Sequence, residues 1–428
     1  MSTKTFVDLI SPYNSCSMPQ TGTDVDKASQ RNAVLAGFMG WMLDAFDFFI
    51  LTLVVNDLAK SFFDTSTPDL AGKARKAIAF TIAMTLMMRP IGALIFGIMA
   101  DRFGRKLPLM LNVVMYASVS MACAFAPNFT VFLILRMIFG IAMGGEWGLG
   151  ASLALESVSP KFRGLLSGVL QEGYAAGALL ASFVYRFVYP SYGWRPLFLI
   201  GGLPALLAIF IRSKVKESPA WHEHRTDWAS YRKAIVSNWR RFAFLVVMMA
   251  VMNFISHGTQ DMYPTFLEQH RGFSPLQRAN TTMIAYLGAI IGGLVFGYYS
   301  DRTSRKRAMV TGLLCCLLFT PLWIAAPNAI WLTVGAFIMQ FFVQGAWGVV
   351  PAHINELSPN AVRGFFPGFA YQLGVACASL FPYLQAVVGE RFTYAQSMGF
   401  LAALVFAVGA IVIALGPEAK GVSFRKHG

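Results

Sequence analysis

The chain has 428 residues, of which 56% are hydrophobic and only 13% are charged. A soluble protein of this size would carry about twice that fraction of charge, so the composition excludes an ordinary soluble globular protein. The net charge of +14 would raise the question of nucleic-acid binding in a soluble chain. Here the basic residues lie in short segments between apolar blocks, where the positive-inside rule of membrane proteins explains them. We therefore expect no nucleic-acid partner.

Apolar blocks long enough to cross a bilayer come in two sets of six. About 20 apolar residues cover the roughly 30 Å of hydrocarbon. The predicted helices are 33–55, 77–100, 107–126, 130–153, 164–188 and 195–213, followed by 242–266, 277–299, 308–326, 329–351, 364–388 and 394–416. We predict an all-α membrane protein of twelve transmembrane helices, with a tail (1–32), a six-helix bundle (33–213), a linker loop (214–241), a second six-helix bundle (242–416) and a tail (417–428).

The loops predict how the chain is oriented. Basic residues follow the even-numbered helices, whereas opposite loops such as 126–128 and 326–328 carry no charge. Both tails are therefore expected in the cytoplasm, and their shortness favours a bacterial inner membrane. The first 30 residues lack the basic and apolar regions of a cleavable signal peptide. The five cysteines show no metal-ligand spacing, so we expect neither a metal nor a cofactor.

Several patterns recur at an offset of 200 residues, which predicts two structurally equivalent halves. The segment 97–106 has the pattern G-x3-D-R-x2-R-K and recurs at 297–306. The same offset relates G-x-W-G at 145–148 and 345–348, E-x6-R-G at 156–164 and 356–364, and A-P-N at 126–128 and 326–328.

The pattern at 97–106 resembles the signature loop of the major facilitator superfamily, and the resemblance extends over the six-plus-six arrangement of the whole chain. Ser304 replaces the second glycine of that signature in the second copy. The segment 216–221 resembles the P-E-S-P-x-W element of the sugar and organic-acid branches, with lysine in its first position. The charged residues of these patterns are expected to pair at the cytoplasmic helix ends and to hold one conformation of the gate: Asp101, Arg105, Glu156, Arg163, Asp301, Arg305, Glu356 and Arg363.

Ionisable residues inside predicted membrane helices mark a transport pathway, because each is costly to bury in hydrocarbon. Asp44 and Asp47 are three residues apart in the first helix and share one of its faces. The other polar positions within the first six helices are Arg89, Arg136, Glu146, and the pair Gln171 and Glu172.

The seventh predicted helix contains the pattern N-x-x-S-H-x-T-Q-D-x-x-x-T at 253–265. It resembles the signature of Jen-type lactate and pyruvate proton symporters, which belong to the sialate:proton symporter family. The segment 43–48, L-D-A-F-D-F, resembles the same family and the related aromatic-acid symporters. The resemblance implies proton-coupled uptake of a short monocarboxylate such as lactate or pyruvate.

Arginine can bind a carboxylate through two parallel hydrogen bonds, and Arg89 is our first choice for this role, since the equivalent position holds Ala289. The alternative is that Asp44 or Asp47 neutralises Arg89 and that it only braces helices. The other expected substrate contacts are Asn253, His257, Gln260 and Gln372.

Proton coupling requires a group whose ionisation changes with its surroundings: burial favours a neutral carboxyl group and a nearby arginine favours a charged one. Asp261 lies four residues after His257, so the two can share a proton, and this pair is preferred, followed by Asp44. The further candidates are Asp47, Arg136 and Glu146, and the alternative for each is a static hydrogen-bonded network. Trp147 and Trp347 are expected to pack helices together.

We therefore expect a monomeric transporter rather than an enzyme, with a small carboxylate, the proton and the lipid bilayer as its partners. Symport of a sialic or aromatic acid is the alternative. Drug efflux is disfavoured because 168–173 lacks a Gly-Pro pair, and a transporter-like sensor because the central loop is short. An ATP-driven pump is excluded because the chain has no phosphate-binding loop of the form G-x4-G-K-[ST].

Overall fold

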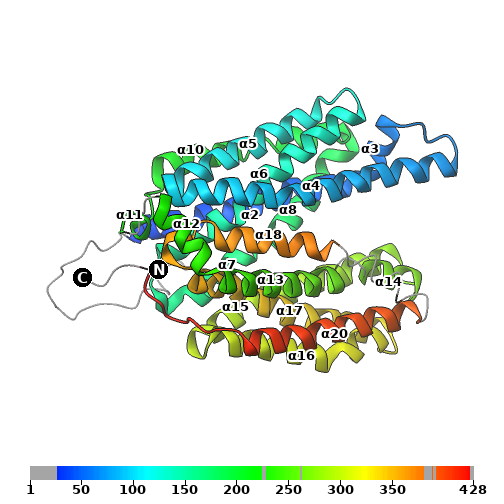
Figure 1. Cartoon of the computed structure of the whole chain (residues 1–428). Helices are drawn as coiled ribbons and strands as arrows, with labels where there is room; N and C mark the ends of the chain where they lie inside the picture. The colour runs from blue at the N-terminus through cyan, green and yellow to red at the C-terminus, as the bar shows by residue number, and fades with distance from the viewer. Residues whose placement is uncertain (1–26, 224–227, 261–262, 380–387, 389–391, 425–428) are drawn as a thin grey trace, which may run out of the picture.

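The computed structural model describes residues 27–223, 228–260, 263–379, 388 and 392–424. The described residues form helices and connecting turns, with no strand among them. Figure 1 shows two bundles of roughly parallel helices lying side by side, one built from the first half of the chain and one from the second. Helix α2 begins, and the segment after α20 ends, at the same end of these bundles, which we call the tail end.

The first bundle contains the helices predicted for the first half of the chain. Their bounds are α2 Lys27–Leu53, α3 Val55–Phe62, α4 Pro68–Phe103, α5 Lys106–Ala124, α6 Phe129–Glu156, α7 Arg163–Gln171, α8 Gly173–Tyr192, α9 Arg195–Ile200 and α10 Ala205–Lys214, with a 3-10 turn at Pro160–Phe162. The predicted helix 164–188 is in fact two helices, α7 and α8. The segment predicted as a linker loop contains α11 (Pro219–Glu223) and α12 (Trp228–Ser237).

The second bundle repeats this arrangement. Its helices are α13 Trp239–Gln260, α14 Tyr263–Gln269, α15 Pro275–Arg302, α16 Arg305–Ala325, α17 Ala329–Leu357, α18 Phe366–Ala378 and α20 Tyr394–Leu415, with a 3-10 turn at Asn360–Val362. Ten helices among the described residues are long and apolar enough to cross a membrane. The α7–α8 pair and α18 occupy the positions of the fifth and eleventh predicted helices.

Equivalent residues start equivalent helices, because a side-chain oxygen at the N-cap satisfies a free backbone N–H of the first turn. Asn128 accepts a hydrogen bond from the N–H of Val131 before α6, and Asn328 accepts one from Trp331 before α17, each at 3.0 Å. The 200-residue repeat of the sequence is therefore also a repeat of local structure.

Small residues let helices within each half approach closely, as is common in membrane proteins. A methyl group added at Gly92 of α4 would overlap the carbonyl oxygen of Ile141 in α6. One added at the equivalent Gly292 of α15 would overlap the carbonyl oxygen of Phe341 in α17. The same packing therefore holds α4 against α6 and α15 against α17.

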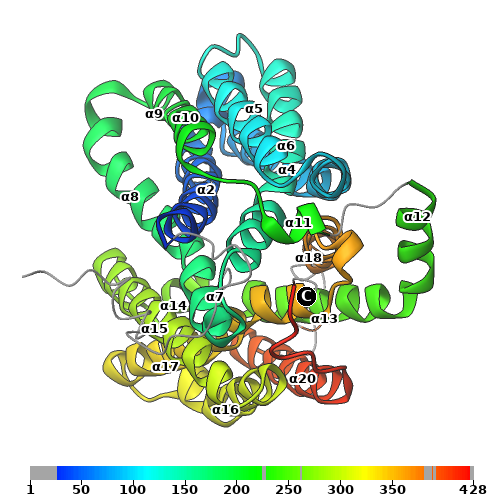
Figure 2. The ribbon, with the colours of Figure 1, turned by 90° about the vertical axis from the view of Figure 1, so that its left-hand side faces the viewer.

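The two halves touch each other through α7 against α15 and α4 against α18. Figure 2 views the bundles from the tail end, where α7, α11 and α18 lie near the junction of the two halves. Methyl groups added at Gly164 and Gly168 of α7 would overlap the carbonyl oxygens of Gly297 and Gly293 of α15. The halves are thus in backbone contact near the tail end.

Candidate functional site

Two aspartates close the tail end reciprocally. The carboxylate of Asp101, at the end of α4, accepts hydrogen bonds from the N–H groups of residues 364–365, at 2.7 and 3.1 Å. In the opposite direction Asp301, at the end of α15, accepts hydrogen bonds from residues 164–165, both at 2.8 Å. Free N–H groups at helix starts favour negative charge, so each half holds the other by an aspartate on a helix start.

Buried arginines fix these aspartates in place. Arg105 contacts Asp101 at 3.1 Å and Glu156 at 3.0 Å. The equivalent Arg305 contacts Asp301 at 2.8 Å and Glu356 at 2.9 Å. Each of these pairs lies within one half.

Two longer ion pairs cross from one half to the other. Arg163 lies 3.7 Å from Glu356, and Arg363 lies 3.9 Å from Glu156. The structure thus brings all eight of the residues that the sequence suggests for a gate into one network.

The segment after α20 covers this network. The ring of Phe424, which is 2% exposed, lies between the guanidinium groups of Arg163 and Arg363, whose carbons are 3.4 and 3.8 Å from the ring centroid. The carbonyl oxygen of Val422 accepts a hydrogen bond of 2.6 Å from Arg163. Glu418 accepts one of 3.0 Å from the N–H of Lys306; partial burial opposes its ionisation, but this hydrogen bond and others hold the pKa of Glu418 below its usual range.

Arg89 lies where the two halves meet, away from the gate. It is 3% exposed, and its guanidinium carbon is 5.7 Å from the ring centroid of Tyr371, on α18 of the second half. Its Nε and Nη2 atoms have no hydrogen-bond partner among the described residues. A buried guanidinium with unused donors is costly unless a ligand pairs with it, so Arg89 can receive an anion here.

Aromatic side chains from both halves gather around Tyr371. Tyr371 stacks on Trp147 with centroids 4.5 Å apart and meets Trp347 edge-on at 6.1 Å. Trp41, which stacks on Tyr174 at 5.3 Å, also contacts Tyr371. We call these five residues the aromatic cluster. The sequence predicts helix packing for its members Trp147 and Trp347 and does not single out the other three.

Two of the predicted substrate contacts of the second half, Gln372 and Asn253, are hydrogen-bonded to backbone carbonyl groups in this conformation. Gln372 donates its amide N–H to the carbonyl oxygen of Gly144, across the junction, at 3.2 Å. Asn253 donates to the carbonyl oxygen of Met249 within α13. His257 lies on α13 and is partly buried, and Asp261 lies outside the described residues.

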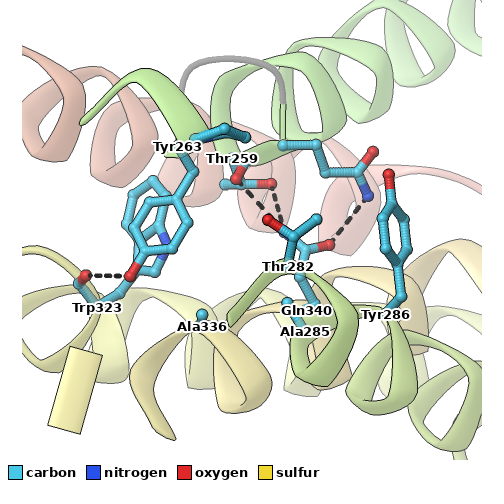
Figure 3. A pocket seen from close by; sticks show the side chains of 10 residues that line it. Thr259, Tyr263, Thr282, Ala285, Tyr286, Trp323, Ala336 and Gln340 are labelled. Atoms are coloured by element: carbon cyan, nitrogen blue, oxygen red, sulfur yellow. Dashed lines mark hydrogen bonds between the residues drawn. The ribbon is translucent and has the colours of Figure 1, made fainter. Parts of the chain in front are cut away.

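Gln260 lines a small pocket of the second half, to which Thr259, Tyr263, Thr282, Tyr286 and Gln340 contribute the other polar side chains (Figure 3). The amide of Gln260 donates to Gln340 at 2.9 Å. The cavity measures about 40 Å³.

The predicted coupling residues of the first half form one buried cluster. Asp44, Asp47, Arg136 and Glu146 are each 0% exposed. One oxygen of Asp47 accepts a hydrogen bond of 2.8 Å from Ser120. Within the part of the chain that the structure describes, both oxygens of Asp44 and of Glu146 have no hydrogen-bond partner.

This cluster is connected to Arg89 by charge. Of the two arginines near Asp44, Arg89 has the stronger electrostatic interaction with its carboxyl group and Arg136 the weaker one. The guanidinium of Arg136 stands over the ring of Phe139, with its carbon 4.0 Å from the centroid. Its three nitrogens find no hydrogen-bond partner in the described ranges. The ionisation of Asp44 therefore alters the field at the proposed anion site.

Two equivalent bundles, closed against each other at one end and enclosing unpaired charges at their junction, define a multi-pass membrane transporter rather than an enzyme. The family model of the Major Facilitator Superfamily matches residues 34–371 and 262–426. The chain belongs to this superfamily.

Known proteins with similar sequences and structures agree with this assignment. The chain is 27% identical over 391 residues to a carboxylic acid transporter protein homolog of Saccharomyces cerevisiae, covering 84% of this chain but only 62% of that protein's length. It is 27% identical over 404 residues to the sialic acid transporter NanX of Escherichia coli, covering 92% and 96% of the two chains. The structure of the proton:xylose symporter XylE superposes with a TM-score of 0.74 at 19% identity, covering 92% and 97%.

Proposed function

We propose that the protein takes up a short monocarboxylate of the lactate or pyruvate class together with a proton, by alternating access. The observation that carries this proposal is Arg89, a buried guanidinium at the junction of the halves, two of whose nitrogens have no partner among the described residues. A substrate carboxylate would supply the missing partner through charge-assisted hydrogen bonds.

The neighbourhood of Arg89 suits a small acid with an apolar body. The ring of Tyr371 lies on one side of the guanidinium and belongs to the half opposite Arg89. A ligand bound between them would contact both halves, as alternating access around a midplane site requires. The similar proteins from yeast and Escherichia coli are both named for acids, and the pattern at 253–265 favours a short one.

We assign the tail end to the cytoplasm, because the basic loops of the sequence lie there. The present conformation is then closed to the cytoplasm by the reciprocal aspartates. Release of substrate requires Asp101 and Asp301 to leave the helix starts of the opposite half. A proton carried inward with the anion cancels its charge, so that uptake does not oppose an inside-negative membrane potential.

The decisive measurement is uptake of labelled L-lactate into proteoliposomes, with and without an inward acid gradient. Wild-type protein should accumulate lactate only with the gradient. Arg89→Ala should abolish uptake, and Arg89→Lys should retain a fraction of it, because an ammonium group keeps the charge but not the paired geometry. Uptake that survives Arg89→Ala would remove Arg89 from the binding site.

The second candidate function is proton-coupled symport of a sialic or aromatic acid. The aromatic cluster beside Arg89 favours it, as does the printed name of the Escherichia coli relative. Gradient-driven uptake of such an acid without lactate uptake would select this candidate and leave the role of Arg89 in place.

A further inference from the structure

One buried carboxyl group has no place in the gate or in the cluster around Asp44. Glu172 lies where α7 ends and α8 begins: its N–H donates to the carbonyl oxygen of Gly168, and its own carbonyl oxygen accepts from Ala176. Its side chain is 6% exposed. The junction of the two helices thus carries a carboxyl group that is buried inside the protein.

Glu172 continues the contact between the two halves. Gly164 and Gly168 of α7 pack on Gly297 and Gly293 of α15, and the next position four residues along α7 is Glu172. A methyl group added at Gly293 would overlap Oε1 of Glu172. The carboxyl group of the first half is therefore pressed against the backbone of α15 in the second half.

In the closed conformation one oxygen of this carboxyl group, Oε1, is buried without a hydrogen-bond donor in the described part of the chain. The acidic groups on the helices packed around it are Asp44 and Asp47 on α2, Glu146 and Glu156 on α6, Asp301 on α15 and Glu356 on α17. Among the described residues no ion pair joins Glu172 to an arginine, lysine or histidine. An unpaired ionised carboxylate in such a place is costly, so this conformation favours the neutral acid.

We propose that Glu172 binds the coupling proton while the α7–α15 contact is closed and releases it to the side on which that contact opens. The inference rests on the proposed proton symport and names the group that carries the proton. By comparison, Asp47 contacts Ser120 and Glu146 lies against Gly40, both within the first half. Movement of one half against the other must change the surroundings of Glu172, because its contact belongs to the other half.

The experiment compares Glu172→Gln with the wild type in two modes of transport. Glutamine mimics the protonated acid, so the exchange of labelled for unlabelled lactate at equal pH on both sides should persist. Accumulation of lactate driven by an inward acid gradient, and the accompanying alkalinisation of the outer medium, should be lost. Exchange by the wild type should fall as the pH rises, whereas exchange by Glu172→Gln should not depend on pH in the same range.

The control is Glu172→Asp, which keeps an ionisable group and should retain gradient-driven accumulation. Accumulation by Glu172→Gln at the wild-type level would overturn the assignment of Glu172 and leave symport standing. A wild type that exchanges lactate but never accumulates it with a gradient would overturn both proposals. If Glu172→Gln does not exchange lactate, proton uptake on lactate binding by the purified proteins decides: proton uptake by this variant equal to that of the wild type removes Glu172 from the coupling.

Discussion

At the scale of single residues, Tyr371 is the side chain through which the second half reaches Arg89. A cation over an aromatic ring in a desolvated site gains on the order of 1–2 kcal/mol. Tyr371→Ala should therefore weaken lactate binding roughly tenfold, whereas Tyr371→Phe, which keeps the ring, should bind almost as the wild type does. Calorimetry on the purified protein measures both. Equal losses in the two variants would show that the hydroxyl group, and not the ring, is what matters.

Phe424 is the second residue with a measurable role, because its ring separates two guanidinium groups that would otherwise repel each other. Phe424→Ala should open the tail end in a larger fraction of molecules. The reporter is a cysteine at position 167 in a variant without the native cysteines. Ser167 is 0% exposed and accepts a hydrogen bond of 2.9 Å from Ala352 of the other half, so a thiol there reacts with a water-soluble reagent only in open molecules.

Val422→Ala is the matched control, since Val422 belongs to the same segment but is 40% exposed. Its side chain should be dispensable, because its hydrogen bond to Arg163 comes from the backbone. An equal rate of thiol labelling in Phe424→Ala and Val422→Ala would contradict a specific role for the ring.

Charged residues can be predicted from the sequence more readily than aromatic ones. A charge within an apolar block stands out. Its repetition at a fixed offset is enough to recognise Arg105 and Arg305 as equivalent positions of the two halves. Tyr371 and Phe424 carry no such signal, because aromatic residues are common in membrane helices and at their ends. The contact of Gln372 cannot be predicted from the sequence either, because its amide donates to the backbone carbonyl oxygen of Gly144 in the other half, and every residue has such an acceptor.

At the scale of helices, the contact of α7 with α15 depends on the absence of side chains. A methyl group at Gly168 would overlap the backbone oxygen of Gly293, and a backbone cannot move aside as a flexible side chain can. Gly168→Ala should therefore prevent closure at the tail end, slow uptake strongly and raise thiol labelling at position 167.

Gly72 provides the control for this substitution, because a methyl group added there meets nothing within 4 Å. Gly72→Ala should transport and label as the wild type does. Normal uptake by Gly168→Ala would mean that the contact between α7 and α15 is looser in the membrane than the structure describes.

Helix positions follow from hydropathy, but the interruption of the fifth crossing does not. The predicted helix 164–188 is apolar enough to be read as continuous, and Gln171 and Glu172 stand out in it only as polar residues. Backbone hydrogen bonds of Glu172 with Gly168 and Ala176 bridge the junction of α7 and α8, and the local distortion there is held by the helices packed around it. Such tertiary support cannot be read from the segment itself.

At the scale of the whole molecule, the segment after α20 adds a closure to the reciprocal aspartates. Deleting residues 417–428 removes the contacts of Glu418, Lys420 and Phe424 with the rest of the protein. Molecules with this deletion should spend more time open at the tail end, and labelling at position 167 should be faster. A deletion of 425–428 alone keeps these contacts and should label as the full chain does. Identical labelling in the two deletions would contradict the closure.

The linker and the segment after α20 occupy equivalent positions. Glu217 accepts a hydrogen bond of 3.1 Å from the N–H of Lys106, as Glu418 does from Lys306. Lys106 donates its side-chain amine to the carbonyl oxygen of Arg212, and Lys306 donates its own to Gly416. One pattern of contacts therefore holds both segments against the tail end: a carboxylate accepts from the first N–H groups of a helix, and a lysine of that helix donates to a backbone carbonyl oxygen.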